Sequence, residues 1–171
     1  MGREPVLLEQ GAFYEPILMS ELAIRNRQRS RRLHVSLLKR VVRAVLADLL
    51  CLRDFEVCVH LVSSLTIARL NARFLQHSGA TDVITFDAFD SPRPDRIAGE
   101  IFISVDDAVA HARQFRTSWQ SEIVRYSIHG ILHLRGFDDL KPARRRVMKR
   151  QEDRLLRQIR QRFPLHQLSR K

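Results

Sequence analysis

The chain has 171 residues, a length that suits one domain with a real hydrophobic core. Hydrophobic residues make up 44% of it, which excludes an intrinsically disordered chain, and no apolar run is long enough to cross a bilayer. We therefore expect no membrane partner and no secretory signal. Cys51 and Cys58 form neither a C-x-x-C motif nor a disulfide framework, which favours a reducing, cytoplasmic location and a core role for Cys58.

The formal net charge of +11 is concentrated near the C-terminus. Residues 141–171 contain twelve Lys or Arg and two acids, so this segment carries +10 and residues 1–140 carry only +1. Most of these cations are arginines, whose planar donor groups suit phosphate. A solvated helix face is the alternative, but we favour a surface that binds nucleic acid.

Apolar spacing predicts four strands and five helices after an N-terminal extension over residues 1–20. In chain order, the predicted elements are a strand at 22–26, a helix at 34–50, a strand at 55–62, a helix at 63–75, strands at 82–86 and 97–103, and helices at 104–115, 118–134 and 142–162.

Residues that favour helix starts support several of these bounds. Ser104 is a suitable N-cap, Ser118 or Thr117 can cap the helix that follows, and Pro142 suits the first turn of the last helix. The strands at 82–86 and 97–103 are expected to be hairpin neighbours. The order predicts one α+β domain, over residues 21–160, with a small mixed four-stranded sheet packed by about five helices and a metal site at the end of a helix. Residues 161–171 are expected to form a basic tail.

The segment His129–Asp139 has the spacing of a three-ligand metal site. His129 and His133 are four residues apart, so they project from one face of a helix. Gly136 can end that helix with a positive φ, which would let Asp139 fold back toward the imidazoles. Two histidines and one carboxylate leave the fourth position of a tetrahedral zinc open, as in catalytic sites. The alternative is that these histidines bind no metal.

The same spacing is similar to the H-E-x-x-H motif of zinc peptidases. Gly130 stands where those enzymes carry their general-base Glu. A glycine cannot accept a proton from water, so we expect a metal hydrolase of another kind and disfavour a peptidase.

Several ordered blocks over residues 22–158 resemble the YbeY endoribonuclease family of rRNA maturation factors. The blocks are Ile24–Gln28, Leu70–Asn71, Thr81–Phe86, Gly99–Ser104, His129–Asp138, and the pair Met148 and Glu152. The resemblance implies a cytoplasmic, zinc-dependent endoribonuclease specific for single strands. Its role would be in 3′-end maturation of small-subunit rRNA and in ribosome quality control. It also implies one Zn²⁺ per chain, no organic cofactor, and rRNA precursor and the small ribosomal subunit or its proteins as partners.

The resemblance carries the metal ligands over to His129 and His133, which we also expect to be catalytic. The family's third histidine is Asp139 here, and we keep it as the third ligand. An anionic ligand should make bound water less acidic, so the activity optimum should lie at higher pH than in a three-His relative. Leu75 stands where many members have an Arg, with His77 as a partial substitute.

Further polar residues have weaker assignments. Glu100 opens a strand in one of the blocks that resemble the family and is our candidate for a catalytic carboxylate, with an edge-strand or capping carboxylate as the alternative. Asp138 could orient a ligating imidazole, and Thr81 and Asp82 are expected to shape a turn. Five cations of the last helix could grip phosphates: Arg144, Arg145, Arg146, Lys149 and Arg150.

A different class of function stays open. The departures at Leu75 and Asp139 favour a non-catalytic, metal-containing ribosome-assembly factor that binds rRNA or ribosomal protein. Chelator-sensitive RNA cleavage separates this alternative from the endoribonuclease.

Overall fold

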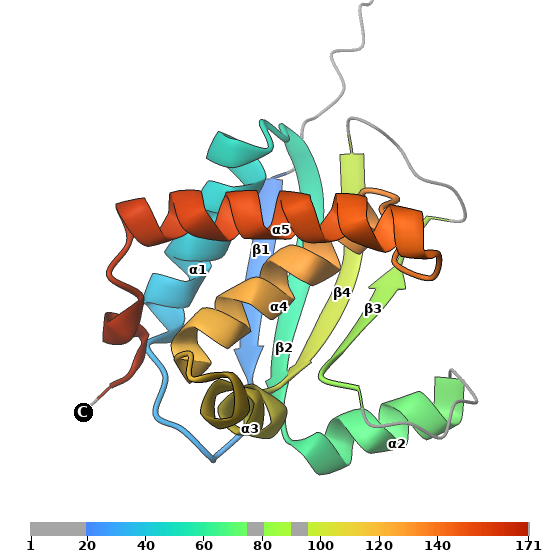
Figure 1. The fold of residues 1–171 in the computed structure, drawn as a ribbon. Coiled ribbons are helices and arrows are strands. Elements are labelled where there is room, and N and C mark those ends of the chain that lie inside the picture. Colours follow the sequence, from blue (N-terminus) through green and yellow to red (C-terminus); the bar gives the residue numbers. More distant parts are fainter. Residues whose placement is uncertain (1–19, 75–80, 90–95, 171) are drawn as a thin grey trace, which may run out of the picture.

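The computed structural model describes residues 20–74, 81–89 and 96–170. Its elements follow the predicted order (Figure 1). They are β1 (Ser20–Asn26), α1 (Val35–Arg43), η1 (Ala44–Leu49), β2 (Asp54–Val62), α2 (Ser64–Phe74), β3 (Val83–Asp87), β4 (Arg96–Ser104), α3 (Val105–Phe115), α4 (Trp119–Leu134), α5 (Pro142–Arg162) and η2 (Leu165–Leu168). No helix within these ranges is long and apolar enough to span a membrane.

The four strands form one mixed sheet in the order β1-β2-β4-β3. Strands β1, β2 and β4 are parallel, and β3 runs antiparallel to β4, with Ile84 opposite Phe102. The predicted fold class and the pairing of the third and fourth strands are therefore confirmed. The antiparallel edge strand β3 borders the site described below.

Helix α4 packs directly on one face of the sheet, and α5 crosses over α4 (Figure 1). Two glycines allow this close approach. A Cβ on Gly130 would lie 2.6 Å from the Ile101 side chain of β4, and a Cβ on Gly99 would lie 2.6 Å from the Leu134 side chain. A side chain at position 130 would push the helix away from the sheet. The absence of the peptidase glutamate therefore has a packing reason.

The opposite face of the sheet is covered over β3 and β4 by α2 (Figure 1). Val62, Ile67 and Ile84 form a small separate core there. The main core lies on the α4 face and continues to the C-terminal end, because Leu165 and Leu168 of η2 are buried in it. Residues predicted as a basic tail thus contribute to the core.

The helix starts are set by side-chain caps at the predicted positions. The Ser104 hydroxyl accepts from the Asp107 N–H, and the Ser118 hydroxyl accepts from the Ser121 N–H. These bonds satisfy backbone donors that the first turn of a helix leaves unpaired. The caps fix where α3 and α4 begin, and hence where their polar side chains face.

Candidate metal centre

The two histidines of α4 face each other at the C-terminal end of the helix. The Nε2 atoms of His129 and His133 lie 3.0 Å apart. Asp139 Oδ2 lies 3.8 Å from His129 Nε2, and Asp139 Oδ1 lies 3.8 Å from His133 Nε2. Gly136 has a φ of 83°, as predicted, and this turn brings Asp139 back to the imidazoles. The three predicted ligands therefore converge, with one donor atom of each within 4.8 Å of the others.

The Nδ1 atom of each imidazole faces a hydrogen-bond acceptor. His129 Nδ1 lies 3.1 Å from a Glu152 carboxylate oxygen, and His133 Nδ1 lies 3.0 Å from the Phe137 carbonyl oxygen. Both partners only accept hydrogen bonds, so each ring carries its proton on Nδ1. In the neutral rings, the two Nε2 lone pairs then point at one another. This arrangement calls for a cation between them, beside the anionic Asp139.

A tetrahedral zinc fits this set of donors. With Zn–N distances of about 2.0–2.1 Å, two ligating nitrogens are about 3.3 Å apart, close to the 3.0 Å between the Nε2 atoms. Burial, together with the neighbouring His129, lowers the pKa of His133. A lowered pKa favours the neutral imidazole, which is the form that binds a metal.

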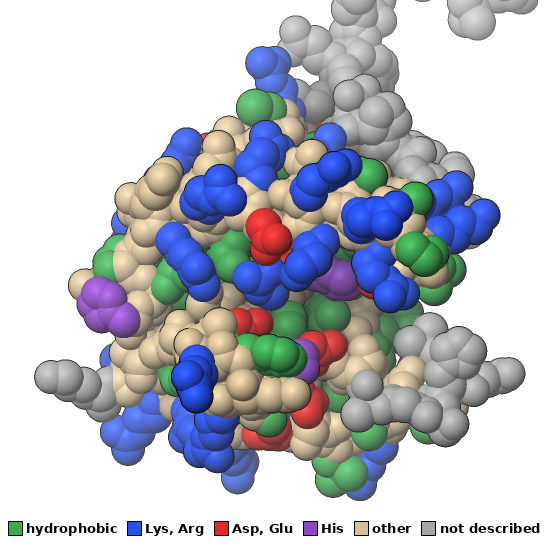
Figure 2. All heavy atoms as spheres, in the orientation of Figure 1, with side chains coloured by type: hydrophobic (Ala, Val, Ile, Leu, Met, Phe, Trp, Pro, Cys, Tyr) green, Lys and Arg blue, Asp and Glu red, His purple; other side chains and the backbone are tan. Residues whose placement is uncertain are grey.

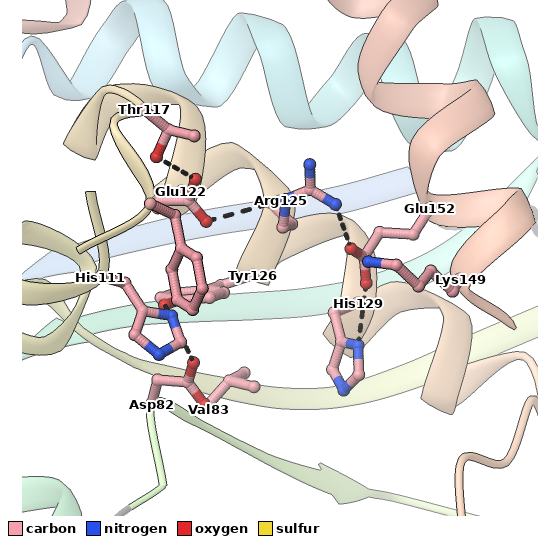
Figure 3. A pocket seen from close by; sticks show the side chains of 11 residues that line it. Asp82, Val83, His111, Thr117, Glu122, Arg125, Tyr126, His129, Lys149 and Glu152 are labelled. Atoms are coloured by element: carbon pink, nitrogen blue, oxygen red, sulfur yellow. Dashed lines mark hydrogen bonds and ion pairs between the residues drawn. The ribbon is translucent and has the colours of Figure 1, made fainter. Parts of the chain in front are cut away.

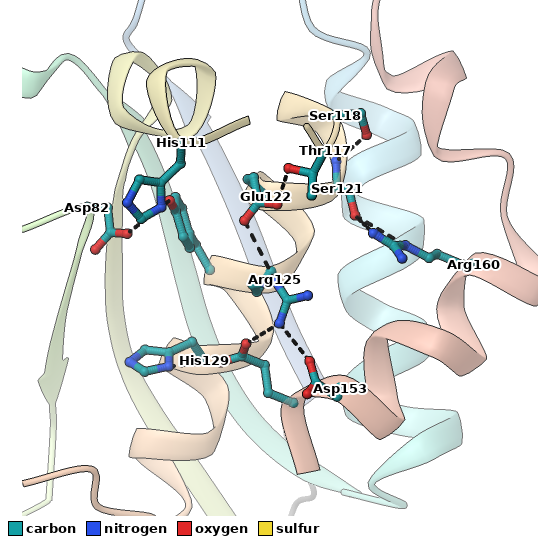
Figure 4. A network of polar contacts seen from close by, with 12 residues as sticks. Asp82, His111, Thr117, Ser118, Ser121, Glu122, Arg125, His129, Asp153 and Arg160 are labelled. Carbon is teal, nitrogen blue, oxygen red and sulfur yellow. Dashed lines mark hydrogen bonds and ion pairs between the residues drawn. The ribbon is translucent and has the colours of Figure 1, made fainter. Parts of the chain in front are cut away.

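Glu152 ties the site to the last helix. Its carboxylate also accepts a 2.6 Å hydrogen bond from Arg125 Nη1, and the same nitrogen donates to Asp153 at 2.8 Å (Figure 4). Burial alone would raise the pKa of Glu152, but the bonds from His129 and Arg125 lower the pKa below its usual value. Glu152 is therefore held ionised, which keeps the proton of His129 on Nδ1.

The loop between α4 and α5 is braced by cations from the start of α5. Arg144 pairs with the Asp138 carboxylate at 2.8 Å, and Arg145 Nε donates to the Asp139 carbonyl at 2.9 Å. The prediction that Asp138 orients an imidazole is wrong, because Asp138 instead accepts from the Leu140 N–H and Arg144. Arg144 and Arg145 thus hold the metal loop.

A hollow opens beside α5 on the face shown in Figure 2, and residues of α3, α4, α5 and β3, including His129, line it. A cavity of about 390 Å³ and a smaller one of about 250 Å³ share Val83 and His129. The cations of α5 form the upper rim of this face, while carboxylates lie inside the hollow (Figure 2). Lys149 is the cation of α5 that lines the larger cavity. Such a groove suits a chain whose phosphates follow the rim.

Glu100 lies away from this centre. It follows Gly99, which faces α4, so its side chain points to the opposite face of the sheet. There it contacts His60 Nε2 at 3.2 Å, and Cys58 completes a second cluster of metal-binding residue types. Cys58 is half-buried there, whereas a core position was predicted. The structure does not bring Glu100 to the two ligating histidines.

The remaining predicted residues divide into three groups. The Thr81 hydroxyl donates to the Val83 carbonyl and shapes the turn as predicted, whereas Asp82 lines the larger cavity. Arg146 and Arg150 are exposed on α5. Leu75 and His77 lie outside the described residues.

Sequence reasoning assigned no role to Arg125 or Glu152 at the metal. A signal was present in the chain, since Glu122, Arg125, His129 and His133 follow at spacings of three, four and four. These spacings place a polar stripe on one face of an otherwise apolar helix. The stripe implied a buried polar partner, which the fold supplies from α5.

The sequence of this chain is similar to known endoribonucleases. Residues 23–160 match the family described as Endoribonuclease YbeY. A protein of that name from Chlorobium phaeobacteroides is 39% identical over 122 residues, or 71% of this chain and 86% of that protein. One from Salinibacter ruber is 38% identical over 97 residues, or 53% of this chain; the match spans only 62% of that relative's length.

A solved structure shows the same architecture. The solution structure of TM1509 from Thermotoga maritima is 25% identical, with a TM-score of 0.60 over 81% of this chain and 89% of that one. The fold and site define an α+β domain with a two-His, one-carboxylate centre at the end of a helix. The chain belongs to the endoribonuclease YbeY family.

Proposed function

We propose that this protein is a zinc-dependent endoribonuclease that cleaves single-stranded RNA, with zinc held by His129, His133 and Asp139. One observation carries the proposal: the two Nε2 atoms lie 3.0 Å apart beside a carboxylate, while each Nδ1 atom lies within hydrogen-bond distance of an acceptor oxygen. Family membership supports RNA as the substrate. The substrate we propose is an rRNA precursor, processed at the small-subunit 3′ end in the cytoplasm, together with a role in ribosome quality control and contact with the small subunit.

The residues divide the chemistry between them. When bound, zinc supplies Lewis-acid activation of water and of a phosphoryl oxygen near neutral pH. Glu152 and the Phe137 carbonyl hold the two imidazoles in the tautomer that presents Nε2. Asp139 adds the anionic oxygen. Lys149, at the edge of the cavity beside His129, places a positive charge where a phosphate would approach.

Glu100 has no part in this proposal, because its side chain lies on the other face of the sheet beside His60. The second cluster there is a weaker metal site. Burial raises the pKa of the Cys58 thiol and so disfavours the thiolate that binds metals, and the positive charge of the nearby Arg25 and Arg27 opposes binding of a divalent cation. We therefore assign one zinc per chain, at the histidine pair.

The test combines metal content with cleavage of an unstructured RNA. We expect about one zinc in the native protein and cleavage that a chelator abolishes and zinc restores. His133→Ala should lose both zinc and cleavage, whereas His166→Ala, an exposed histidine of η2, should keep both. Native protein that binds zinc and RNA without cutting would support the assembly-factor alternative instead.

A further inference from the structure

The larger cavity has more room than the metal chemistry uses. Its volume of about 390 Å³ lies in the range of small-molecule sites, ~300–1,000 Å³. His129 forms part of its wall, so any occupant lies next to the metal ligands. The lining comes from β3, α3, α4 and α5, whose side chains point into one space (Figure 3).

One wall of the cavity is aromatic. Phe115 is 62% exposed, although it is a large apolar side chain at the end of α3. Its ring packs edge-to-face on His111, with centroids 5.3 Å apart and planes at 87°. The Tyr126 hydroxyl lies 2.9 Å from His111 Nδ1 and fixes that ring. A rigid, exposed aromatic pair at the mouth of a cavity provides a stacking surface for a flat ligand.

The charges around the cavity favour different positions for the phosphate and for the base of a bound nucleotide. Asp82, Glu122 and Glu152 lie inside, so a phosphate there would meet carboxylates. Lys149 lies on the α5 side, where the basic rim begins (Figure 2). A nucleotide can therefore set its phosphate against α5 and its uncharged base in the cavity.

We infer that this cavity is a nucleobase subsite, which receives the base of a nucleotide next to the scissile phosphate and stacks it on the Phe115 ring, which His111 supports edge-to-face. The inference deepens the proposed function and rests on RNA being the ligand. A base held in a duplex cannot enter, so the subsite itself selects single strands.

The polar wall also sets a preference among bases. The Asp82 carboxylate offers acceptors only. It lies 3.7 Å from His111 Nδ1 and also interacts with the Tyr126 hydroxyl, and its two oxygens have further lone pairs that can accept from a ligand. The exocyclic amino group of adenine, cytosine or guanine can donate to this carboxylate from the edge of the base, whereas uracil offers only its ring N3–H. The subsite therefore favours adenine, cytosine or guanine over uracil.

The test uses binding, so it does not depend on cleavage. Zinc-loaded full-length protein is titrated with oligouridine hexamers that carry one 2-aminopurine at each position in turn. We expect the fluorescence to be quenched at one or two positions, with tighter binding than all-uridine RNA. Phe115→Ala should remove the quenching and weaken binding roughly five- to hundredfold, and Phe115→Tyr should retain both.

A matched control is Phe74→Ala, which removes a 54% exposed phenylalanine of α2 that does not line the cavity. It should leave quenching and affinity unchanged. Thermal melts establish that each variant is folded. Unquenched fluorescence at every position, equal loss in Phe74→Ala, or no RNA binding at all would each overturn the subsite.

Failure of the nuclease proposal gives a different result. Quenching that depends on Phe115, without cleavage, would leave the subsite standing and remove the catalytic role. RNA cleavage with unchanged fluorescence at all positions would support the nuclease proposal and overturn the subsite.

Discussion

Replacing Glu152 by Gln tests how the last helix controls the metal centre. The side chain keeps its size but loses its charge. The amide oxygen can accept from His129 or from Arg125, and the amide NH₂ then faces the other donor. Either orientation breaks one of the two bonds. We expect zinc affinity to fall ~10–100-fold, the usual effect of removing such a partner of a ligating histidine.

The same change should lower the stability of the metal-free protein. The Glu152 side chain is 10% exposed and its 2.6 Å bond to Arg125 is charge-assisted, so the loss should be about 1.5–3 kcal/mol. Asp153 and Glu122 remain as partners of Arg125. Urea titration of metal-free protein measures this loss of unfolding free energy, and competition with a chromophoric chelator measures zinc affinity.

Asp153→Asn is the matched control. Asp153 contacts the same Arg125 nitrogen as Glu152, but in the described structure it has no contact with either histidine. The zinc affinity of the Asp153→Asn variant should stay within about threefold of that of the native protein, since the tautomer of His129 is unaffected. Equal affinities for native protein and a folded Glu152→Gln variant would refute the role given to this carboxylate.

Three further predictions concern packing, acid stability and activity. Gly130→Ala should destabilise by about 1–3 kcal/mol, measured in urea, because its Cβ meets Ile101; a loss under about 0.5 kcal/mol would contradict the close packing. Hydrogen bonds from two serines lower the pKa of Asp106, so its contribution is present above the usual pKa and is lost as pH falls through the lowered one; Asp106→Asn should flatten the acid limb of stability more than Asp107→Asn does. Asp139→His should move the pH optimum of RNA cleavage downward, and superimposed profiles would exclude an anionic ligand.

The convergence of the proposed metal ligands could be predicted because these residues lie close together in the sequence. His129, His133 and Gly136 belong to one helix and its end, where spacing determines geometry. Their orientation could not be predicted in the same way. Glu152 reaches His129 only because α5 crosses α4, and no local pattern fixes that crossing.

Two other differences have clear physical reasons. The helix predicted over 34–50 is an α-helix only to Arg43 and continues as the π-helix η1, where the Leu50 N–H donates to the Val45 carbonyl. Apolar spacing is nearly the same in both, so it cannot separate them. Glu100 was predicted to be catalytic because it belongs to a strand segment that resembles the family. Side chains alternate along a strand, so Glu100 points to the opposite face of the sheet from Gly99.

Because Glu152 belongs to α5 and contacts the proposed ligand His129 on α4, the proposed metal site makes metal binding and docking of the last helix linked equilibria. Zinc that binds more tightly when α5 is docked must, by the same free energy, hold α5 in place. That helix also carries the cationic rim and Lys149. Under the proposed function, loss of zinc would therefore weaken the cationic surface proposed to bind RNA as well as the cleavage, so metal-free protein would bind RNA less tightly.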